Sequence, residues 1–371
     1  MNFLALVAGA LTLLSVVVTL LVRLGFKLCG RRPERFRRKA MLVHAVLVPV
    51  FVLFGGPLFF AWFGSEMIGT RGDERAYAGP RISADGTWIL QSRETLAAER
   101  RGRPVPPDLA AAAAEATVRL TTDDGVSLRA FRVLPRGTPR ATVIVAHGLF
   151  RGGLEIEAPA NMWRDLGAAV LMLEMRNHGV GGRTKPTFGW EERRDVLAAA
   201  AFAKADPELG RHPLVLFAVS LGTVAAMRAA PDIPGLAGVV LDAPTDDMLA
   251  TAHRMLGRTP RPGQRGLALV QPFRSLTLAA VEAWCGFRFA DIRPADAFER
   301  VSADVPVLVI GGSEDARMPP ETLEEVFRRL PTKAEKKRLW IRSGSDHGQV
   351  WIDDPSGYRE RLSSFLTLAA P

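Results

Sequence analysis

The pattern of apolar and polar positions divides the chain into two regions of different character. Residues 2–22 and 41–64 contain no charged side chain. Each stretch is long enough to cross the hydrocarbon core of a bilayer as a helix, which takes about 20 residues. Beyond residue 116, short apolar runs alternate with longer amphipathic segments. The pattern therefore predicts a membrane anchor over residues 1–63, with two transmembrane helices, followed by a globular domain.

Each apolar stretch has an alternative interpretation. The alternative for residues 2–22 is a cleaved signal peptide, but no basic residues precede the apolar run. The alternative for residues 41–64 is a buried core helix, which an uncharged run of this length disfavours. Pro49 and Pro57 lie in this second stretch and predict a kinked helix. We therefore expect two uncleaved membrane spans.

A strongly basic loop, residues 23–39, separates the two apolar stretches. It holds eight lysine and arginine side chains against the single acid Glu34. Such an excess on a short loop is typical of the cytoplasmic side of a membrane, and it also suits anionic lipid headgroups. With this loop inside, the rest of the chain faces outward. We expect the protein in the inner cell membrane, with its main domain on the extracytoplasmic (periplasmic) side.

Net charge and cysteine content agree with this topology. The anchor carries a net charge of +7, so the remaining residues contribute only +2 of the total of +9. The basic composition is therefore no argument for nucleic-acid binding, and we expect none. Cys29 lies in the cytoplasmic loop and Cys285 in the outer domain, so the two do not form a structural disulfide.

The outer region begins with a connector and continues as an α/β domain. Residues 64–116 are rich in glycine and proline and predict a connector, with one short strand near Thr87–Leu90. In residues 117–371, continuous apolar runs that alternate with helical segments predict a mostly parallel sheet with helices on both faces. The expected strands are Thr117–Leu120, Val126–Val133, Ala141–Ala146, Ala169–Leu173, Leu214–Ala218, Gly238–Leu241, Val305–Ile310 and Lys337–Ile341. The expected helices are Ile156–Leu166, Trp190–Ala205, Leu221–Ala230, Glu321–Leu330 and Pro355–Ala369.

Ser220 lies where a central strand turns into the next helix. A serine in this position usually caps the helix through its side-chain oxygen. The surrounding residues Ala218-Val219-Ser220-Leu221-Gly222, however, resemble the nucleophile elbow G-x-S-x-G of the α/β-hydrolase superfamily, with alanine at the first small position. The resemblance covers roughly residues 117–370. It implies an α/β-hydrolase fold and a nucleophilic role for Ser220.

Two further segments resemble the loops of this superfamily. His147-Gly148-Leu149-Phe150 follows a predicted strand and is similar to its oxyanion loop. The resemblance implies that the backbone N–H groups of Leu149 and Leu221 bind the oxyanion, whereas His147 only shapes the loop. Arg176-Asn177-His178-Gly179 resembles a turn that follows the fourth strand, with Glu174 where aspartate is commoner. We take this turn as support for the fold alone.

The resemblance also supplies an acid and a base for the serine. Asp315 lies in a segment similar to the G-x-x-D-x-x-x-P turn that carries the acid, ahead of its competitors Glu314 and Asp242. His347 lies in the loop after the last predicted strand, where the superfamily keeps its base. The order Ser220, Asp315, His347 is the order expected for this fold. These three residues are the predicted catalytic triad.

Residues 244–303 form a long insertion between two predicted strands, which commonly becomes a helical lid in this superfamily. Its piece Gly266–Phe289 holds more apolar side chains than one narrow helix face can pack. We therefore expect a membrane-anchored serine hydrolase that cleaves an ester or thioester of lipid-like or small-molecule character, with no metal or organic cofactor. Peptidase and acyltransferase reactions use the same machinery and stay open. The alternative that is not an enzyme is a catalytically silent, membrane-bound scaffold with the hydrolase fold.

Overall fold

A computed structural model describes residues 55–57, 59, 117–149, 157–178, 182–257 and 268–371. The predicted span 2–22, most of 41–64, the basic loop and the connector with its strand lie outside these residues. Within the described ranges, no helix combines the length and apolar character that crossing a bilayer requires. The chain divides into two compact units: one is Met1–Gly64 with Met255–Trp284, and the other is Ser65–Arg254 with Cys285–Pro371.

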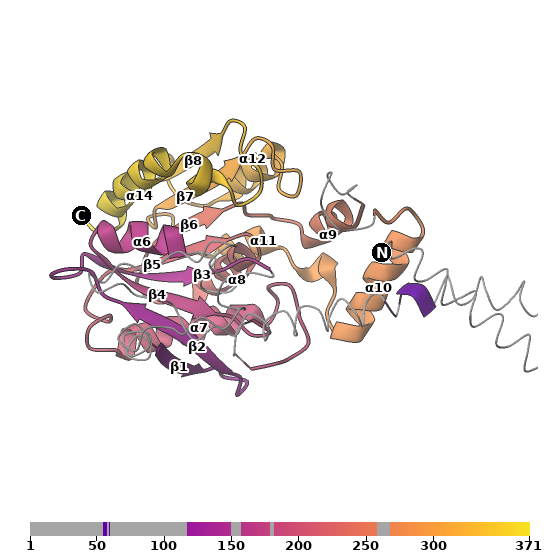
Figure 1. Ribbon diagram of the computed structural model, residues 1–371, viewed down its shortest axis with the longest axis horizontal. Coiled ribbons are helices and arrows are strands. Elements are labelled where there is room, and N and C mark those ends of the chain that lie inside the picture. Colours follow the sequence, from indigo (N-terminus) through magenta and orange to yellow (C-terminus); the bar gives the residue numbers. More distant parts are fainter. Residues whose placement is uncertain (1–54, 58, 60–116, 150–156, 179–181, 258–267) are drawn as a thin grey trace, which may run out of the picture. The chain divides into compact units, whose positions relative to one another are not determined.

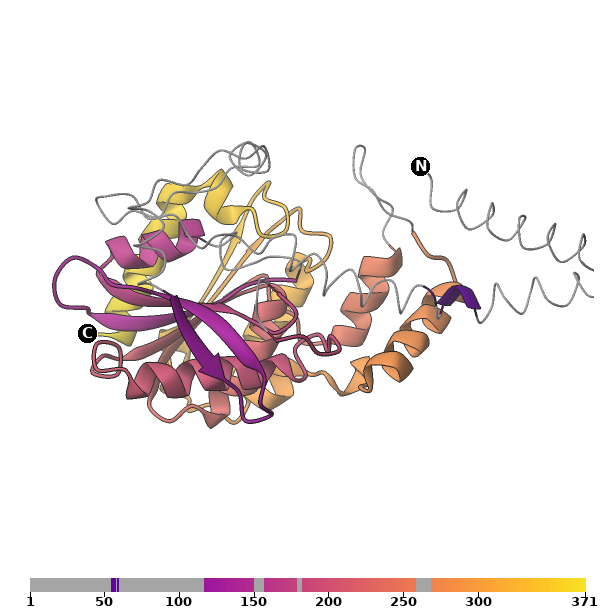
Figure 2. The same ribbon diagram turned by 60° about the horizontal axis from the view of Figure 1, so that its bottom comes forward.

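The second unit is built on an eight-stranded sheet in the order β1-β2-β4-β3-β5-β6-β7-β8 (Figure 1). Strands β1 and β2 pair antiparallel with each other, β2 pairs antiparallel with β4, and every other pair is parallel. Figure 2 shows that the sheet twists strongly between its two edges. The strands are β1 (Thr117–Thr121), β2 (Ser127–Val133), β3 (Ala141–Ala146), β4 (Ala168–Glu174), β5 (Leu214–Val219), β6 (Leu236–Asp242), β7 (Val307–Gly312) and β8 (Lys337–Arg342). The predicted mostly parallel sheet is confirmed.

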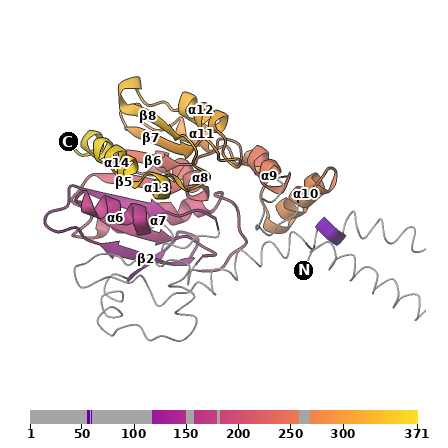
Figure 3. The same ribbon diagram turned by 45° about the horizontal axis from the view of Figure 1, so that its top comes forward.

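Helices bury both faces of this sheet, because the central strands are apolar on both sides. In β3, for example, Ile144 packs into one core and its neighbours Val143 and Val145 into the other. The helices α6 and α14 lie side by side over one face, together with α13 (Figures 1 and 3). The opposite core is formed with α7, α8, α11 and α12. These elements are α6 (Glu157–Asp165), α7 (Glu192–Ala205), α8 (Leu221–Ala229), α11 (Pro294–Phe298), α12 (Pro320–Arg329), α13 (Val350–Asp353) and α14 (Pro355–Ala369).

The long stretch between β6 and β7 contains several helices among its described residues. It contains α9 (Met248–Gly257), α10 (Phe273–Cys285) and the short α11. Residues Met255–Trp284 belong to the first compact unit, whereas α11 packs on α8 within the second. The sequence pattern did not predict α11 or α13, because helices of five and four residues are too short to show a helical period.

Candidate active site

Ser220 sits on a sharp turn between β5 and α8. Its backbone has φ 53° and ψ −120°, in a region that favours glycine. Its side chain forms no capping hydrogen bond with the helix. Instead, its Oγ lies 2.8 Å from Nε2 of His347. The capping interpretation of Ser220 is therefore wrong, and the hydroxyl is directed toward a base.

The turn requires very close approach of neighbouring backbones. A Cβ atom placed on Gly222 would lie 2.5 Å from the carbonyl oxygen of Ala146 and 2.7 Å from that of His147. A Cβ atom on Gly148 would lie 3.1 Å from Cβ of Ser220. Helix α8 thus begins against the end of β3, and the loop after β3 passes directly beside the serine. This explains why both positions hold glycine.

His347 connects Ser220 to a carboxylate. It lies in the loop between β8 and α13, and its Nδ1 is 2.6 Å from Oδ2 of Asp315. A carboxylate can only accept, so Nδ1 carries the proton and Nε2 is free to accept the hydroxyl proton of Ser220. Both His347 and Asp315 are buried. The structure therefore brings the three predicted triad residues together in the arrangement Ser–His–Asp.

Asp315 is itself held rigidly by its own loop. Its second oxygen, Oδ1, accepts the backbone N–H groups of Arg317 at 2.8 Å and Met318 at 3.0 Å. The competing acids are placed differently. Glu314 is exposed, and Oδ2 of Asp242 accepts the hydroxyl of Tyr358 at 2.7 Å. Of the three candidate carboxylates, Asp315 is the one bonded to the histidine.

His147 is the buried first residue of the loop that follows β3, and it takes no part in this chain of bonds. Its Nδ1 donates to the carbonyl of Gly148 at 2.8 Å, and its Nε2 accepts the backbone N–H of Met175 at 3.1 Å. Burial holds its pKa well below the usual value, and the nearby ring of His178 adds to this effect. A neutral ring fits both bonds, so His147 fixes the loop before Leu149.

Leu149 and Leu221, the two predicted oxyanion donors, lie in the loop after β3 and at the start of α8, respectively. Leu149 follows Gly148, whose backbone abuts Ser220. Leu221 is the first residue of α8, and the first N–H groups of a helix have no acceptor within the helix. The oxyanion role of their N–H groups stays a prediction. Among the described residues, no group of acidic, histidine and cysteine side chains is arranged to hold a metal ion.

The profile of the alpha/beta hydrolase family matches residues 143–361, a range that includes Leu149, Ser220, Asp315 and His347. The chain belongs to this family. An uncharacterized protein of Bacillus subtilis (strain 168), YqkD, is 24% identical over 247 residues, which are 65% of this chain and 76% of that protein.

Two solved structures illustrate the similarity of fold. The Pyrococcus furiosus esterase Pf2001 has a TM-score of 0.55 and 20% identity, over 68% of this chain and 91% of that one. Est1E from Butyrivibrio proteoclasticus, solved with ferulic acid bound, has a TM-score of 0.51 and 18% identity, over 67% of this chain and 98% of that one. At this identity, the likeness concerns the fold.

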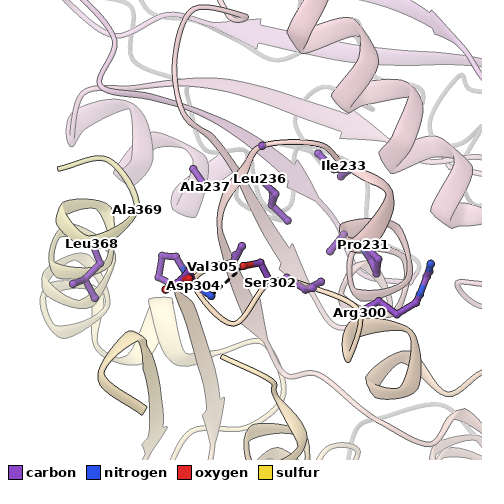
Figure 4. Close-up of a pocket in the computed structure, with 14 residues that line it drawn as sticks. Pro231, Ile233, Leu236, Ala237, Arg300, Ser302, Asp304, Val305, Leu368 and Ala369 are labelled. Atoms are coloured by element: carbon purple, nitrogen blue, oxygen red, sulfur yellow. Dashed lines mark hydrogen bonds between the residues drawn. The ribbon is translucent and has the colours of Figure 1, made fainter. Parts of the chain in front are cut away.

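This alpha/beta hydrolase has a cavity of about 510 Å³ at the opposite end of its sheet (Figure 4). The cavity opens where β6 and β7 begin, beside Leu236 and Val305, whereas Ser220 and Asp315 follow the ends of their strands. Its wall is both apolar and polar, and its charged residues Arg300 and Asp304 are paired with Asp232 and with two lysines, respectively. The cavity is therefore separate from the serine site.

The sequence pattern missed one ion pair that joins β2 to the end of β4 in this alpha/beta hydrolase. Glu174 receives two hydrogen bonds from the guanidinium of Arg129, at 2.6 and 2.9 Å. The two residues are paired across β2 and β4. A glutamate in place of the commoner aspartate reaches its partner across the sheet. The strand register that aligns them is not visible from the local motif.

Proposed function

We propose that this protein is a membrane-anchored serine hydrolase that cleaves a carboxylic ester or thioester through an acyl-enzyme. The observation that supports the proposal is the continuous chain of hydrogen bonds from Asp315 through His347 to Ser220. A serine hydroxyl is unreactive unless a base takes its proton, and the imidazole is positioned to do so. The family membership and the strained turn at Ser220 agree with this role.

The proposed reaction uses these three side chains in turn. Oγ of Ser220 attacks the acyl carbon while Nε2 of His347 takes the hydroxyl proton, and Asp315 stabilises the resulting imidazolium. The tetrahedral intermediate then collapses, and His347 returns the proton to the leaving alcohol or thiol. A water molecule, activated by the same histidine, attacks the acyl-enzyme and releases the carboxylic acid. The serine is thereby regenerated.

The oxyanion of each tetrahedral intermediate needs donors that are already in place. We assign this role to the backbone N–H groups of Leu149 and Leu221. Each such donor is typically worth about 3–4 kcal/mol to the transition state. The bonds of His147 to Gly148 and Met175 support this assignment, because they hold the loop that carries Leu149.

Membrane anchoring is part of the same proposal. It rests on the two uncharged stretches 2–22 and 41–64 and on the arginine-rich loop between them. The proposed substrate carries an acyl chain, because the insertion before β7 is rich in apolar side chains. Val270 and Trp284 in this insertion are exposed. Apolar surface of this kind suits a lipid-like ester presented near a bilayer.

Labelling with a fluorophosphonate probe tests the proposed chemistry. The full chain in detergent should react covalently, and Ser220→Ala should abolish labelling. As a control, Ser356→Ala changes an exposed serine at the start of α14 and should label like the wild type. Failure of the wild-type protein to react would contradict the enzyme proposal and favour a silent scaffold.

A further inference from the structure

Helix α9 begins a few residues after β6 and is fixed at its start. Oδ1 of Asp247 accepts the backbone N–H of Ala250 at 2.8 Å, as a helix-capping carboxylate does. Within the first turns, the buried hydroxyls of Thr245 and Thr251 are bonded to each other at 2.8 Å. These contacts order the start of α9, whose residues up to Arg254 belong to the second compact unit. Arg254 lies on this helix, one turn after Thr251.

The guanidinium of Arg254 joins this helix to the loop of the triad acid. Its Nη2 donates to Oγ1 of Thr251 at 2.8 Å, and its Nε donates to the backbone carbonyl of Arg317 at 3.1 Å. The N–H of the same residue, Arg317, donates to Oδ1 of Asp315. Arg317 therefore links Arg254 to Asp315, the carboxylate bonded to His347.

We infer that Arg254 is a positioning residue that holds the Asp315 loop in the geometry needed by His347. The inference rests on the proposed function of the triad. Backbone hydrogen bonds of Ser313 and Glu314 hold the part of the loop before Asp315, whereas the part after it, where Ala316 is exposed, receives the bond from Arg254. A charged donor from a neighbouring helix supplies a strong bond to its backbone.

The charges around Arg254 agree with this role. Burial lowers the pKa of its guanidinium, while the carboxylates of Asp247, Asp246 and Asp315 act in the opposite direction. The cation is thus close enough to the triad acid to interact with its charge.

Kinetics of substituted proteins test the inference. Arg254→Met should lower kcat for an aryl ester by about tenfold and leave KM unchanged, because it removes a charge-assisted bond that acts on the triad alone. Arg254→Lys keeps a cation and a donor and should recover most of kcat. The matched control is Arg293→Met, which removes a neighbouring ion pair to Asp247 and should leave kcat unchanged.

A double-mutant cycle shows whether the effect passes through Asp315. In an Asp315→Ala background, Arg254→Met should change kcat by less than about twofold, because the group it positions is gone. An equal loss of kcat in both backgrounds would overturn the inference. If Arg254→Met fails to fold, Thr251→Val serves in its place. It removes one anchor of the guanidinium and should show a smaller loss of kcat with the same dependence on Asp315.

A spectroscopic measurement separates this inference from the proposed function. The Nδ1 proton of His347 should give a downfield NMR signal that disappears in His347→Gln. In Arg254→Met this signal should broaden or shift, and in Arg293→Met it should not. An unchanged signal in Arg254→Met would overturn the inference whether or not the protein hydrolyses esters. If the signal changes in Arg254→Met but the wild-type protein hydrolyses no ester, the proposed function is contradicted and the positioning role of Arg254 is not.

Discussion

Three side chains from three different loops share two short hydrogen bonds, and each has a separate task in the proposed reaction. Ser220 supplies the nucleophile, His347 moves the proton, and Asp315 selects the tautomer of the histidine. Each loop follows the carboxyl end of a parallel strand, β5, β7 or β8, so the fold itself brings the residues together. Loss of Asp315 should therefore lower kcat by a different factor from loss of Ser220 or His347.

Substitution of the triad should therefore have graded effects. Ser220→Ala or His347→Ala should lower kcat on an aryl ester by roughly 10⁶-fold, since neither step has a substitute. Asp315→Asn should lower it by roughly 10⁴-fold, because an amide favours the wrong tautomer. Circular dichroism should show intact folding in all three. Wild-type esterase activity in Ser220→Ala would refute the assignment of the elbow.

At the scale of elements, the narrow space between the start of α8 and the end of β3 limits the size of the side chain at residue 222. Gly222→Ala would place a methyl group 2.5 Å from the backbone oxygen of Ala146, which cannot move away easily. We expect loss of activity and a lower melting temperature. Gly257→Ala is the matched control, since a methyl group there meets only the flexible side chain of Arg274. Equal melting temperatures of the two variants would show that the contact at Gly222 is not limiting.

The insertion between β6 and β7 allows a prediction about substrate choice. In the proposed function, its apolar side chains contact the acyl chain, and each buried methylene contributes about 0.8 kcal/mol. The value of kcat/KM on aryl esters should then rise from acetyl toward medium chains. Leu269→Asp or Trp284→Asp should blunt this rise, whereas Leu134→Asp, at an exposed site after β2, should not. A strict preference for acetyl in every variant would point to a small polar ester.

At the scale of the whole molecule, the proposed topology follows from the distribution of charge. A reporter that is active only outside the cytoplasm should be active when fused after Pro371 and inactive when fused near Arg35. The reason is that the arginine-rich loop is retained on the cytoplasmic side. A cytoplasmic signal from the C-terminal fusion would contradict this orientation. It would leave the proposed ester chemistry untouched.

Much of the fold was predictable because its signal is local. All eight strands of the sheet were predicted, with β3 matched at both ends and β6 beginning two residues earlier than expected. Ser220, Asp315 and His347 could be selected because parallel strands bring their carboxyl ends to one edge. The contacts of Asp242 with Tyr358 and of Arg254 with the Asp315 loop could not be predicted. They join residues far apart in the sequence, and no local pattern records them.

The backbone of Ser220 has a consequence for the heat resistance of the protein. At φ 53° and ψ −120°, any side chain is strained, at a cost of roughly 1–3 kcal/mol. Glycine adopts this conformation freely, so Ser220→Gly should melt at a higher temperature than Ser220→Ala, although both lack the hydroxyl. Calorimetry of the two inactive proteins measures the difference. A higher melting temperature for the alanine variant would show that the turn is relaxed. A higher melting temperature for the glycine variant would show that the strained conformation of Ser220 lowers the stability of the protein. The nucleophile is then kept at a cost in stability, since the more stable glycine variant has no hydroxyl and is inactive.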